Sequence, residues 1–398
     1  MNELRRKIEA EIRRSGPIPF SQYMDMCLYD REFGYYSRNA AQFGKAGDFY
    51  TSSDIHAVFG RLLARQFEEM WRVMDSPERV TLLELGPGRG LFARDVLDWS
   101  EKKFPDFFRA SQYVLAEKSP ALCRRIAENL PKRHLESGKA TLRAAGSEGL
   151  SIQDLIAATP DSRVQSNPNQ TNPTQANPTI VFANEFFDAM PVEILSTEGS
   201  LRIDAREGRF VETWTQTRDA EVEFLDRYSI HPEPGERVEV PLAAMVQMRA
   251  LTMMKQGFMV VIDYGYTREE QLAGRHRGTV KAIRQHSVSA NPYEAPGEQD
   301  ITADVNFTAL AKAAESQGCD VHKLLTQSQL LMGIGEANQF ADAFEDCRLP
   351  QERAKVALQL KHLVTPAGMG ESFQVLVASK GVELERVSKL AGLGFGGR

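Results

Sequence analysis

Three glycines at alternate positions follow an apolar run in LLELGPGRGLFARDVL, residues 82–97. Gly86, Gly88 and Gly90 allow a strand to turn sharply, and they let backbone N–H groups approach a ligand because glycine has no Cβ. A nicotinamide-binding fingerprint would place its third glycine three residues after the second, where this chain has Leu91. The spacing therefore disfavours a nicotinamide oxidoreductase, an alternative that detectable NADH binding would revive.

Two acidic residues accompany this glycine turn. Glu84 precedes Gly86 by two residues, and its carboxylate would repel a phosphate but suit an ammonium or sulfonium ligand. Glu117 ends the next apolar run, where a carboxylate can accept hydrogen bonds from both ribose hydroxyls of a nucleotide. Each acid alone is a weak signal, because an exposed Glu is usually only solvated. Together with the glycines, they predict a binding site for S-adenosylmethionine.

The elements that must position these residues follow an α/β pattern. Short runs of apolar and β-branched residues lie at 80–85, 113–117, 179–184, 258–263, 279–283 and 373–378. Helical patterns lie between or beside them, at 91–99, 121–130, 241–256 and 336–363. Runs that are apolar throughout indicate strands buried on both faces of a mainly parallel sheet. The sequence predicts a doubly wound, Rossmann-like α/β fold that binds ligands beyond the carboxyl ends of its strands.

Three segments lie outside this alternation. Residues 1–75 are predicted to form an N-terminal helical cap, which leaves 76–398 for the main domain. The Asn- and Pro-rich segment 165–178 cannot bury enough apolar surface to order itself, so we expect a disordered loop. An alternating pattern at about 195–240, interrupted by the turn-like sequence REG, predicts a β-hairpin insertion.

Composition and charge exclude several classes of protein. The 398 residues carry a formal net charge of -6 and no block of basic residues, which disfavours nucleic acid and membrane surfaces as partners. The four cysteines are scattered without metal or redox spacing, as in a reduced, intracellular protein. No stretch approaches the roughly 20 apolar residues of a membrane span. We expect a cytoplasmic protein that binds no metal and no nucleic acid.

The order of several motifs resembles the MidA family of class I S-adenosylmethionine-dependent methyltransferases. The similar segments lie at 16–37, 47–60, 83–90, 183–193, 261–265, 296–307 and 365–376. The mitochondrial branch of this family is associated with assembly of respiratory complex I and with protein arginine methylation. The resemblance implies S-adenosylmethionine as the cofactor and an arginine of a protein as the methyl acceptor. It also makes a respiratory-complex subunit a candidate partner.

Candidate catalytic residues lie in the segment NEFFDAMPVE, which follows the apolar run at 179–184. A guanidinium stays charged at neutral pH, so carboxylates must orient one of its nitrogens until its proton leaves. Glu185 and Asp188 are the candidates for this catalytic role, and Asn184 is a candidate for cofactor binding. Alternatively, Asn184 and Asp188 cap the following turn or helix, with the intervening phenylalanines in the core.

Other candidates lie in separate segments. His286 is the histidine best suited to accept a proton, although a single loop histidine is more often structural. Asp263 and Tyr264 end an apolar run, where they would bind substrate or form a strand-end turn. Asp48 and Thr51 belong to the loop GDFYTS, which would close over the cofactor or cap the following helix.

The acceptor is the least determined part of the function. The MidA family usually has Pro-Glu where this chain has Ser53 and Asp54, and often has His in place of Asp304. These departures leave the expected cofactor site intact and concern the acceptor. Because a fold does not determine a substrate, a small-molecule methyltransferase remains an alternative. A second alternative is an assembly chaperone that binds the cofactor without turnover.

Overall fold

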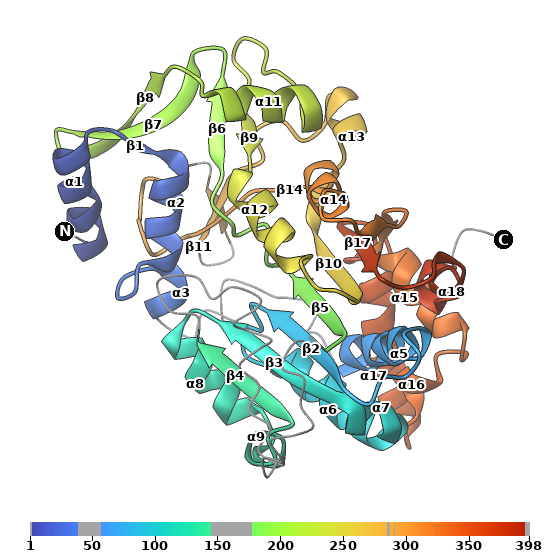
Figure 1. Cartoon of the computed structure of the whole chain (residues 1–398). Helices are drawn as coiled ribbons and strands as arrows, with labels where there is room; N and C mark the ends of the chain where they lie inside the picture. Colours follow the sequence, from blue (N-terminus) through green and yellow to red (C-terminus); the bar gives the residue numbers. More distant parts are fainter. Residues whose placement is uncertain (1, 39–56, 145–176, 285–286, 290, 395–398) are drawn as a thin grey trace, which may run out of the picture.

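The computed structural model describes residues 2–38, 57–144, 177–284, 287–289 and 291–394. A central sheet runs through the molecule with helices on both faces, and a second sheet with the N-terminal helices stands beside it (Figure 1). Among the helices of these residues, none combines the length and apolar character needed to cross a membrane.

The central sheet confirms the expected α/β architecture. Its strands are β2 (Val80–Leu85), β3 (Ser111–Glu117), β4 (Ala140–Ala144), β5 (Thr179–Asn184), β10 (Gly257–Tyr266), β14 (Val305–Asn306), β15 (Asp320–Val321), β16 (Leu325–Thr326) and β17 (Phe373–Lys380). The order is β15-β17-β10-β5-β2-β3-β4, with β14 beside β10 and β16 beside β17. The strands from β4 to β10 are parallel, whereas β17 is antiparallel to β10. The carboxyl ends of β2, β3, β5 and β10 therefore meet at one edge.

Helices cover both faces of this sheet. One face carries α5 (Ala57–Val73), α6 (Leu91–Lys103), α7 (Pro105–Ala110), α15 (Gln327–Glu336), α16 (Ala341–Phe344) and α17 (Pro350–Val364). The other face carries α12 (Leu242–Leu251) and α14 (Phe307–Glu315). Successive residues of β2 enter opposite cores: Leu82 packs in the first and Leu83 in the second. Burial on both faces explains why these strands are apolar throughout.

Three elements differ from the sequence-based expectation. The run at 279–283 becomes β11 (Lys281–Arg284), which lies outside the central sheet. It forms a separate sheet with β12 (Ser287–Ser289) and β13 (Asp300–Thr302). The helix expected at 336–363 is broken, because Gln339 and Phe340 have positive φ and a proline starts α17. The edge strand β4 was not expected, since its sequence ATLRA mixes polar with apolar residues.

The second sheet contains the expected β-hairpin. Its strands are β1 (Ile18–Pro19), β6 (Glu193–Ser196), β7 (Gly199–Arg206), β8 (Arg209–Thr215) and β9 (Val238–Val240), in the order β1-β7-β6-β9 with β8 on β7. Glu207 and Gly208, with φ of 48° and 70°, form the tight turn of the β7–β8 hairpin. The insertion is larger than a hairpin, because it also includes α11 (Asp219–Tyr228) and pairs with the N-terminal strand β1.

The N-terminal cap is smaller than the expected 1–75. Its helices α1 (Glu3–Ser15), α2 (Phe20–Tyr29) and α3 (Tyr35–Arg38) share a third core with the second sheet, where Ile8 and Tyr23 pack with Ile203. By contrast, α5 packs against α6 and the central sheet. The apolar stripe of α5 faces the main core, so this helix belongs to the main domain.

Gly257 provides a test of how tightly β10 is held between its neighbours. It has φ of 149°, and a Cβ there would lie 1.8 Å from the carbonyl oxygen of Thr179 in β5. We expect Gly257→Ala to lower the free energy of unfolding by more than about 2 kcal/mol, measured by urea denaturation. Gly274→Ala is the control, because φ is 84° but nothing lies within 4 Å of the added Cβ. Equal losses in the two variants would contradict the prediction.

Candidate cofactor and acceptor site

The glycine turn lies between β2 and α6, and its three glycines have different surroundings. Gly86, Gly88 and Gly90 have φ of 57°, 53° and 74°, a region that other residues rarely adopt. A Cβ on Gly86 would approach the Phe186 ring at 3.1 Å, and one on Gly90 would approach Ile126 at 3.2 Å. A Cβ on Gly88 would meet no atom of the described residues within 4 Å. The turn is therefore packed at both ends and open at its centre, where a ligand can approach the backbone.

Glu84 lies near the end of β2, two residues before Gly86, and its carboxylate is buried. The Tyr113 hydroxyl on β3 donates a hydrogen bond of 2.9 Å to Glu84 Oε2. Burial raises the pKa of Glu84 to about 8, and the nearby charge of Glu117 acts in the same direction. A buried acid of this kind becomes ionised when a cation binds beside it. This environment is consistent with the expected ammonium or sulfonium ligand.

Glu117 ends β3 at the same edge of the sheet. Its Oε1 accepts a hydrogen bond of 2.8 Å from the backbone N–H of Ser119, and burial raises its pKa to about 7. Ser119 caps α8 (Pro120–Asn129), and its hydroxyl donates to the carbonyl oxygen of Tyr36 in α3. The N-terminal cap is thus attached directly to the strand end that carries Glu117.

Asp263 organises the loop after β5. Its Oδ2 accepts hydrogen bonds from the backbone N–H groups of Phe186, Phe187 and Asp188, at 3.1, 2.9 and 3.3 Å. Its Oδ1 accepts from the N–H of Tyr264 at 2.9 Å. Asp263 is fully buried, and these bonds agree with the alternative of a strand-end turn, in which its carboxylate positions the loop. The substrate contact expected from sequence stays a prediction.

This anchored loop presents the expected catalytic segment. Asn184 Nδ2 donates a hydrogen bond of 3.0 Å to Glu185 Oε1, and Glu185 has φ of 50°. Asn184 Oδ1 and Asp188 Oδ1 are buried, and neither has a hydrogen-bond partner within the described part of the chain. Leaving a buried acceptor unpaired is costly. Donors on a bound ligand would satisfy both atoms.

The cap contributes two tyrosines that the sequence analysis did not select. The Tyr29 hydroxyl donates to the carbonyl oxygen of Ala189 at 3.0 Å, and the Tyr36 hydroxyl donates to Asp300 Oδ1 at 3.0 Å. Burial raises the pKa of both tyrosines, and the carboxylates of Asp300 and Asp188 raise it further. Both rings therefore stay neutral beside Asp188. Aromatic residues in an amphipathic segment are typical of a core, so their sequence pattern did not reveal this position.

A second group of residues reaches the loop from β11 and from the connection between β13 and β14. The N–H of Ala303 donates to the carbonyl oxygen of Asp188 at 2.9 Å. The adjacent Asp304 carboxylate pairs with Lys281 Nζ at 3.0 Å and with His276 Nδ1 at 3.1 Å. Burial, and then the Asp304 charge, raises the pKa of Asp188 to about 7. These residues lie far from Asp188 along the chain, so no local sequence pattern indicated that they approach it.

The remaining candidates have different outcomes. Tyr264 lies half-buried with its ring 3.9 Å from that of Phe373, and its pKa is raised by burial and by the charges of Glu185 and Asp188. Its expected contact with substrate stays a prediction. The expected cofactor residues Asp48 and Thr51, the expected catalytic residue His286, and positions 165–176 of the Asn/Pro loop lie outside the described residues.

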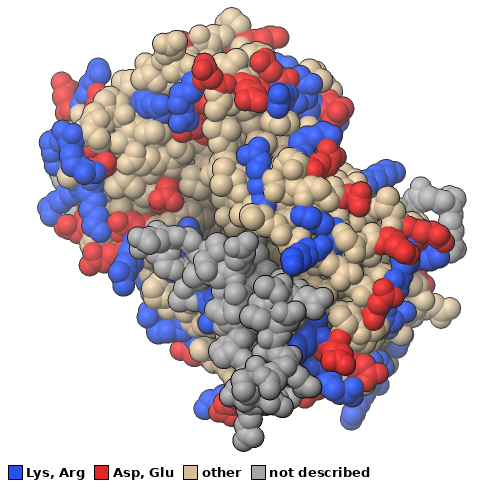
Figure 2. All heavy atoms as spheres, viewed as in Figure 1, with Lys and Arg blue, Asp and Glu red and all other residues tan. Residues whose placement is uncertain are grey.

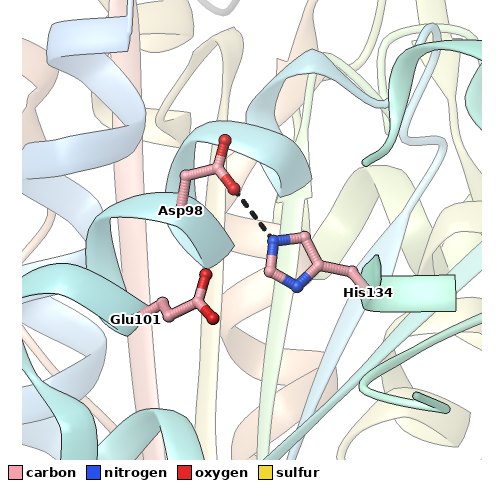
Figure 3. Close-up of side chains that lie close together, drawn as sticks. All are labelled: Asp98, Glu101 and His134. Atoms are coloured by element: carbon pink, nitrogen blue, oxygen red, sulfur yellow. Dashed lines mark hydrogen bonds and ion pairs between the residues drawn. The ribbon is translucent and has the colours of Figure 1, made fainter. Parts of the chain in front are cut away.

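One cluster away from this edge resembles a metal site. Asp98 and Glu101 of α6 lie close to His134 of α9 (Lys132–Glu136), and Asp98 Oδ1 is 2.9 Å from His134 Nε2 (Figure 3). The Arg133 guanidinium contacts both carboxylates and so already supplies a positive charge there. We interpret this cluster as a structural link between the two helices.

The residues at the sheet edge fit S-adenosylmethionine. Glu117 can accept from ribose hydroxyls, and the buried carboxylate of Glu84 suits the positively charged part of the cofactor. The space at Gly88 admits the cofactor to the backbone, and Asn184 Oδ1 offers an unpaired acceptor. The bound cofactor would supply a methyl group on a sulfonium, which is an electrophile. The direct cofactor contacts of all these residues stay predictions.

The open centre of the glycine turn can be tested by adding a methyl group. We expect Gly88→Ala to weaken S-adenosylhomocysteine binding by roughly tenfold or more, measured by calorimetry, because the Cβ enters the ligand space. Gly208→Ala is a matched control: φ is 70°, nothing lies within 4 Å, and the residue is in the β7–β8 turn. We expect Gly208→Ala to introduce similar backbone strain and to leave the ligand affinity unchanged. Unchanged affinity in Gly88→Ala would exclude this position from the site.

The raised pKa of Glu117 predicts pH-dependent binding. 5′-Methylthioadenosine carries the ribose hydroxyls but lacks the amino acid, so it probes Glu117 separately from Glu84. Its affinity should rise as pH increases through about 7, because the ionised carboxylate accepts both hydroxyl hydrogen bonds. Glu117→Gln should bind more weakly and with a flatter pH profile in calorimetric titrations. A flat profile for the unaltered protein would contradict the assignment.

Known proteins resemble this chain along nearly its whole length. A family model described as "Putative S-adenosyl-L-methionine-dependent methyltransferase" matches residues 62–325. A protein named Protein arginine methyltransferase NDUFAF7 homolog, mitochondrial, from Drosophila melanogaster is 29% identical, with 98% of this chain and 88% of that protein covered. The Homo sapiens protein named Protein arginine methyltransferase NDUFAF7, mitochondrial, is 26% identical, with 92% and 81% covered.

A solved structure has a similar fold along nearly the whole chain. A crystal structure of a Burkholderia thailandensis protein bound to S-adenosyl-homocysteine superposes with a TM-score of 0.77 and 25% identity, covering 97% of this chain and 95% of the other. The family match extends over more than half of the chain and includes the glycine turn and the loop after β5. The chain therefore belongs to this family of S-adenosylmethionine-dependent methyltransferases.

Proposed function

We propose that this enzyme transfers the methyl group of S-adenosylmethionine to an arginine side chain of a protein. The observation that carries the proposal is the buried Oδ1 of Asp188, which has no hydrogen-bond partner among the residues that the structure describes. A guanidinium has five N–H donors in a planar fork and no acceptor, so it can donate to a buried acceptor atom of this kind. An uncharged methyl acceptor would not offset the electrostatic cost of burying several carboxylates.

The charges around Asp188 favour a cationic acceptor. The carboxylates whose charges act on Asp188 or on its neighbouring tyrosines include Glu185, Asp263, Asp300 and Asp304, and the charges of Asp25 and Glu117 also act on Tyr29. Lys281, whose positive charge acts on Asp188 in the opposite direction, is already paired with Asp304. A positively charged acceptor would relieve this like-charge repulsion, which supports guanidinium over an uncharged methyl acceptor.

The reaction requires a nucleophilic nitrogen in line with the methyl–sulfur bond. A new nitrogen–carbon bond forms as the sulfur–carbon bond breaks, and the methylated guanidinium then loses one N–H proton. We assign acceptance of that proton to Asp188, since a carboxylate with a pKa of about 7 is a suitable base near neutral pH. Glu185 would hold a second guanidinium nitrogen, which orients the nucleophile. The aromatic side chains of Tyr29 and Phe186 would limit access of water.

A protein acceptor agrees with the relatives and with the visible surface. The relatives described above are named protein arginine methyltransferases. Figure 2 shows that basic and acidic side chains alternate over the visible face, without a continuous basic track of the kind that binds a polyanion. We propose a respiratory-complex subunit as a candidate acceptor on the family resemblance alone. A cytoplasmic location is likewise proposed from composition alone, and the relatives are named mitochondrial.

The proposal predicts that the product contains methylarginine and that a change at Asp188 lowers the rate of methyl transfer. Purified protein incubated with methyl-labelled S-adenosylmethionine and an extract from cells lacking its gene should yield labelled protein that releases methylarginine on hydrolysis. Asp188→Asn should lower kcat by roughly a hundredfold or more, with S-adenosylhomocysteine affinity nearly unchanged. Asp226→Asn is the control, because Asp226 is exposed on α11 and pairs with His231.

The other outcomes distinguish the alternatives. Label confined to small molecules would replace the proposal with metabolite methylation. Tight cofactor binding without label in any fraction would favour an assembly chaperone. Full activity in Asp188→Asn would remove this residue from the mechanism even if methylarginine is formed.

A further inference from the structure

We propose that Asp304, held between Lys281 and His276, is an electrostatic positioning residue whose carboxylate keeps Asp188 able to accept the proton released by the acceptor. The inference rests on the proposed function, because it assigns a task in that reaction. It concerns residues outside the loop after β5, which lie near β11 and at the connection from β13 to β14.

The three residues reach one point from different elements. His276 follows α13 (Arg268–Leu272), Lys281 begins β11, and Asp304 lies between β13 and β14. The two Asp304 oxygens are used separately: Oδ1 faces Lys281 Nζ at 3.0 Å and Oδ2 faces His276 Nδ1 at 3.1 Å. The Asp304 N–H donates to the hydroxyl of Thr279 at 3.1 Å. Asp304 is therefore fixed in position by both its side chain and its backbone.

The neighbours of Asp304 are themselves restrained. The His276 ring stacks on the Tyr266 ring, with centroids 5.1 Å apart and 18° between their planes. The backbone carbonyl of His276 accepts from Gln271 Nε2, and His276 has φ of 55°. The side chains of Asp304, His276 and Lys281 are 15%, 28% and 48% exposed, so the group extends from the buried site toward solvent.

Asp304 is coupled to Asp188 through both structure and charge. The residue before it, Ala303, donates its N–H to the Asp188 carbonyl oxygen at 2.9 Å, which attaches the segment that carries Asp304 to the Asp188 backbone. Like charges resist simultaneous ionisation, so Asp304 raises the pKa of Asp188 while Lys281 lowers it. The two members of this ion pair thus act on Asp188 in opposite directions, and removing either one alone should leave a net effect of the other.

Other ionisable groups also face Asp188 and must be considered. Those groups are Glu185 from the same loop, Asp263 and Tyr264 from β10, Tyr29 from α2 and Tyr36 from α3. The three tyrosines have pKa values raised above their usual range, so they remain neutral through the acidic limb of a pH profile. Glu185 and Asp263 are unchanged in the variants below and contribute equally to every profile.

The test compares pH profiles of kcat/KM for two variants of the full-length enzyme with bound cofactor. Asp304→Asn should move the acidic limb to lower pH by roughly half a unit or more, because a like charge is removed. Lys281→Met should move that limb to higher pH, because an opposite charge is removed. Lys312→Met is the matched control, since Lys312 is exposed on α14 and pairs with Glu315. Shifts in the same direction, or no shift in either variant, would overturn the inference.

A second measurement separates this inference from the proposed function. The Asp188 carboxyl can be titrated by ¹³C NMR in protein bound to S-adenosylhomocysteine, with its signal identified by loss in Asp188→Asn. Opposite displacements in Asp304→Asn and Lys281→Met support the coupling even if no methyl transfer is found, in which case only the proposed function fails. Methyl transfer with an unmoved Asp188 titration would retain the function and refute the role of Asp304.

Discussion

Four backbone N–H groups converge on the buried carboxylate of Asp263, and the geometry of the catalytic loop depends on this interaction. Without these acceptor oxygens, the N–H groups after β5 would be buried and unpaired, which is unfavourable. Their attachment to the end of β10 holds the loop in place, with Glu185 in a left-handed conformation and Asp188 buried. The strand edge therefore supports the loop rigidly. This support has an electrostatic cost, because the Asp263 carboxylate is buried beside those of Asp188 and Glu185.

Burial gives the acids of this site a common property. It raises the pKa of Glu84, Glu117 and Asp188 into the range from about 7 to about 8, although they lie on three different strand ends or loops. In each case a ligand with donors or positive charge would favour the ionised form. Such a site suits a cofactor that carries hydroxyls and cationic groups.

The fold could be predicted where local sequence pattern and burial agree. The strands β2 and β5 have the expected bounds because both of their faces are covered and each contains consecutive apolar residues, Leu82 and Leu83 in β2 and 180–183 in β5. The edge strand β4 contains Thr141 and Arg143, so the same rule does not detect it. Only one residue of β11, Ala282, is buried, and no local signal placed that strand in a separate sheet.

The sequence by itself determined the glycine turn, the acids at the ends of β2 and β3, and the segment with Asn184, Glu185 and Asp188. These features are local, since a strand followed by a tight turn positions its next residues at the sheet edge. Only the tertiary structure decided that Asp263 supports the loop and that Tyr29, Tyr36 and the Asp304 group surround Asp188. Those contacts join residues far apart along the chain, and their electrostatic effect depends on distance and burial, which no sequence spacing contains.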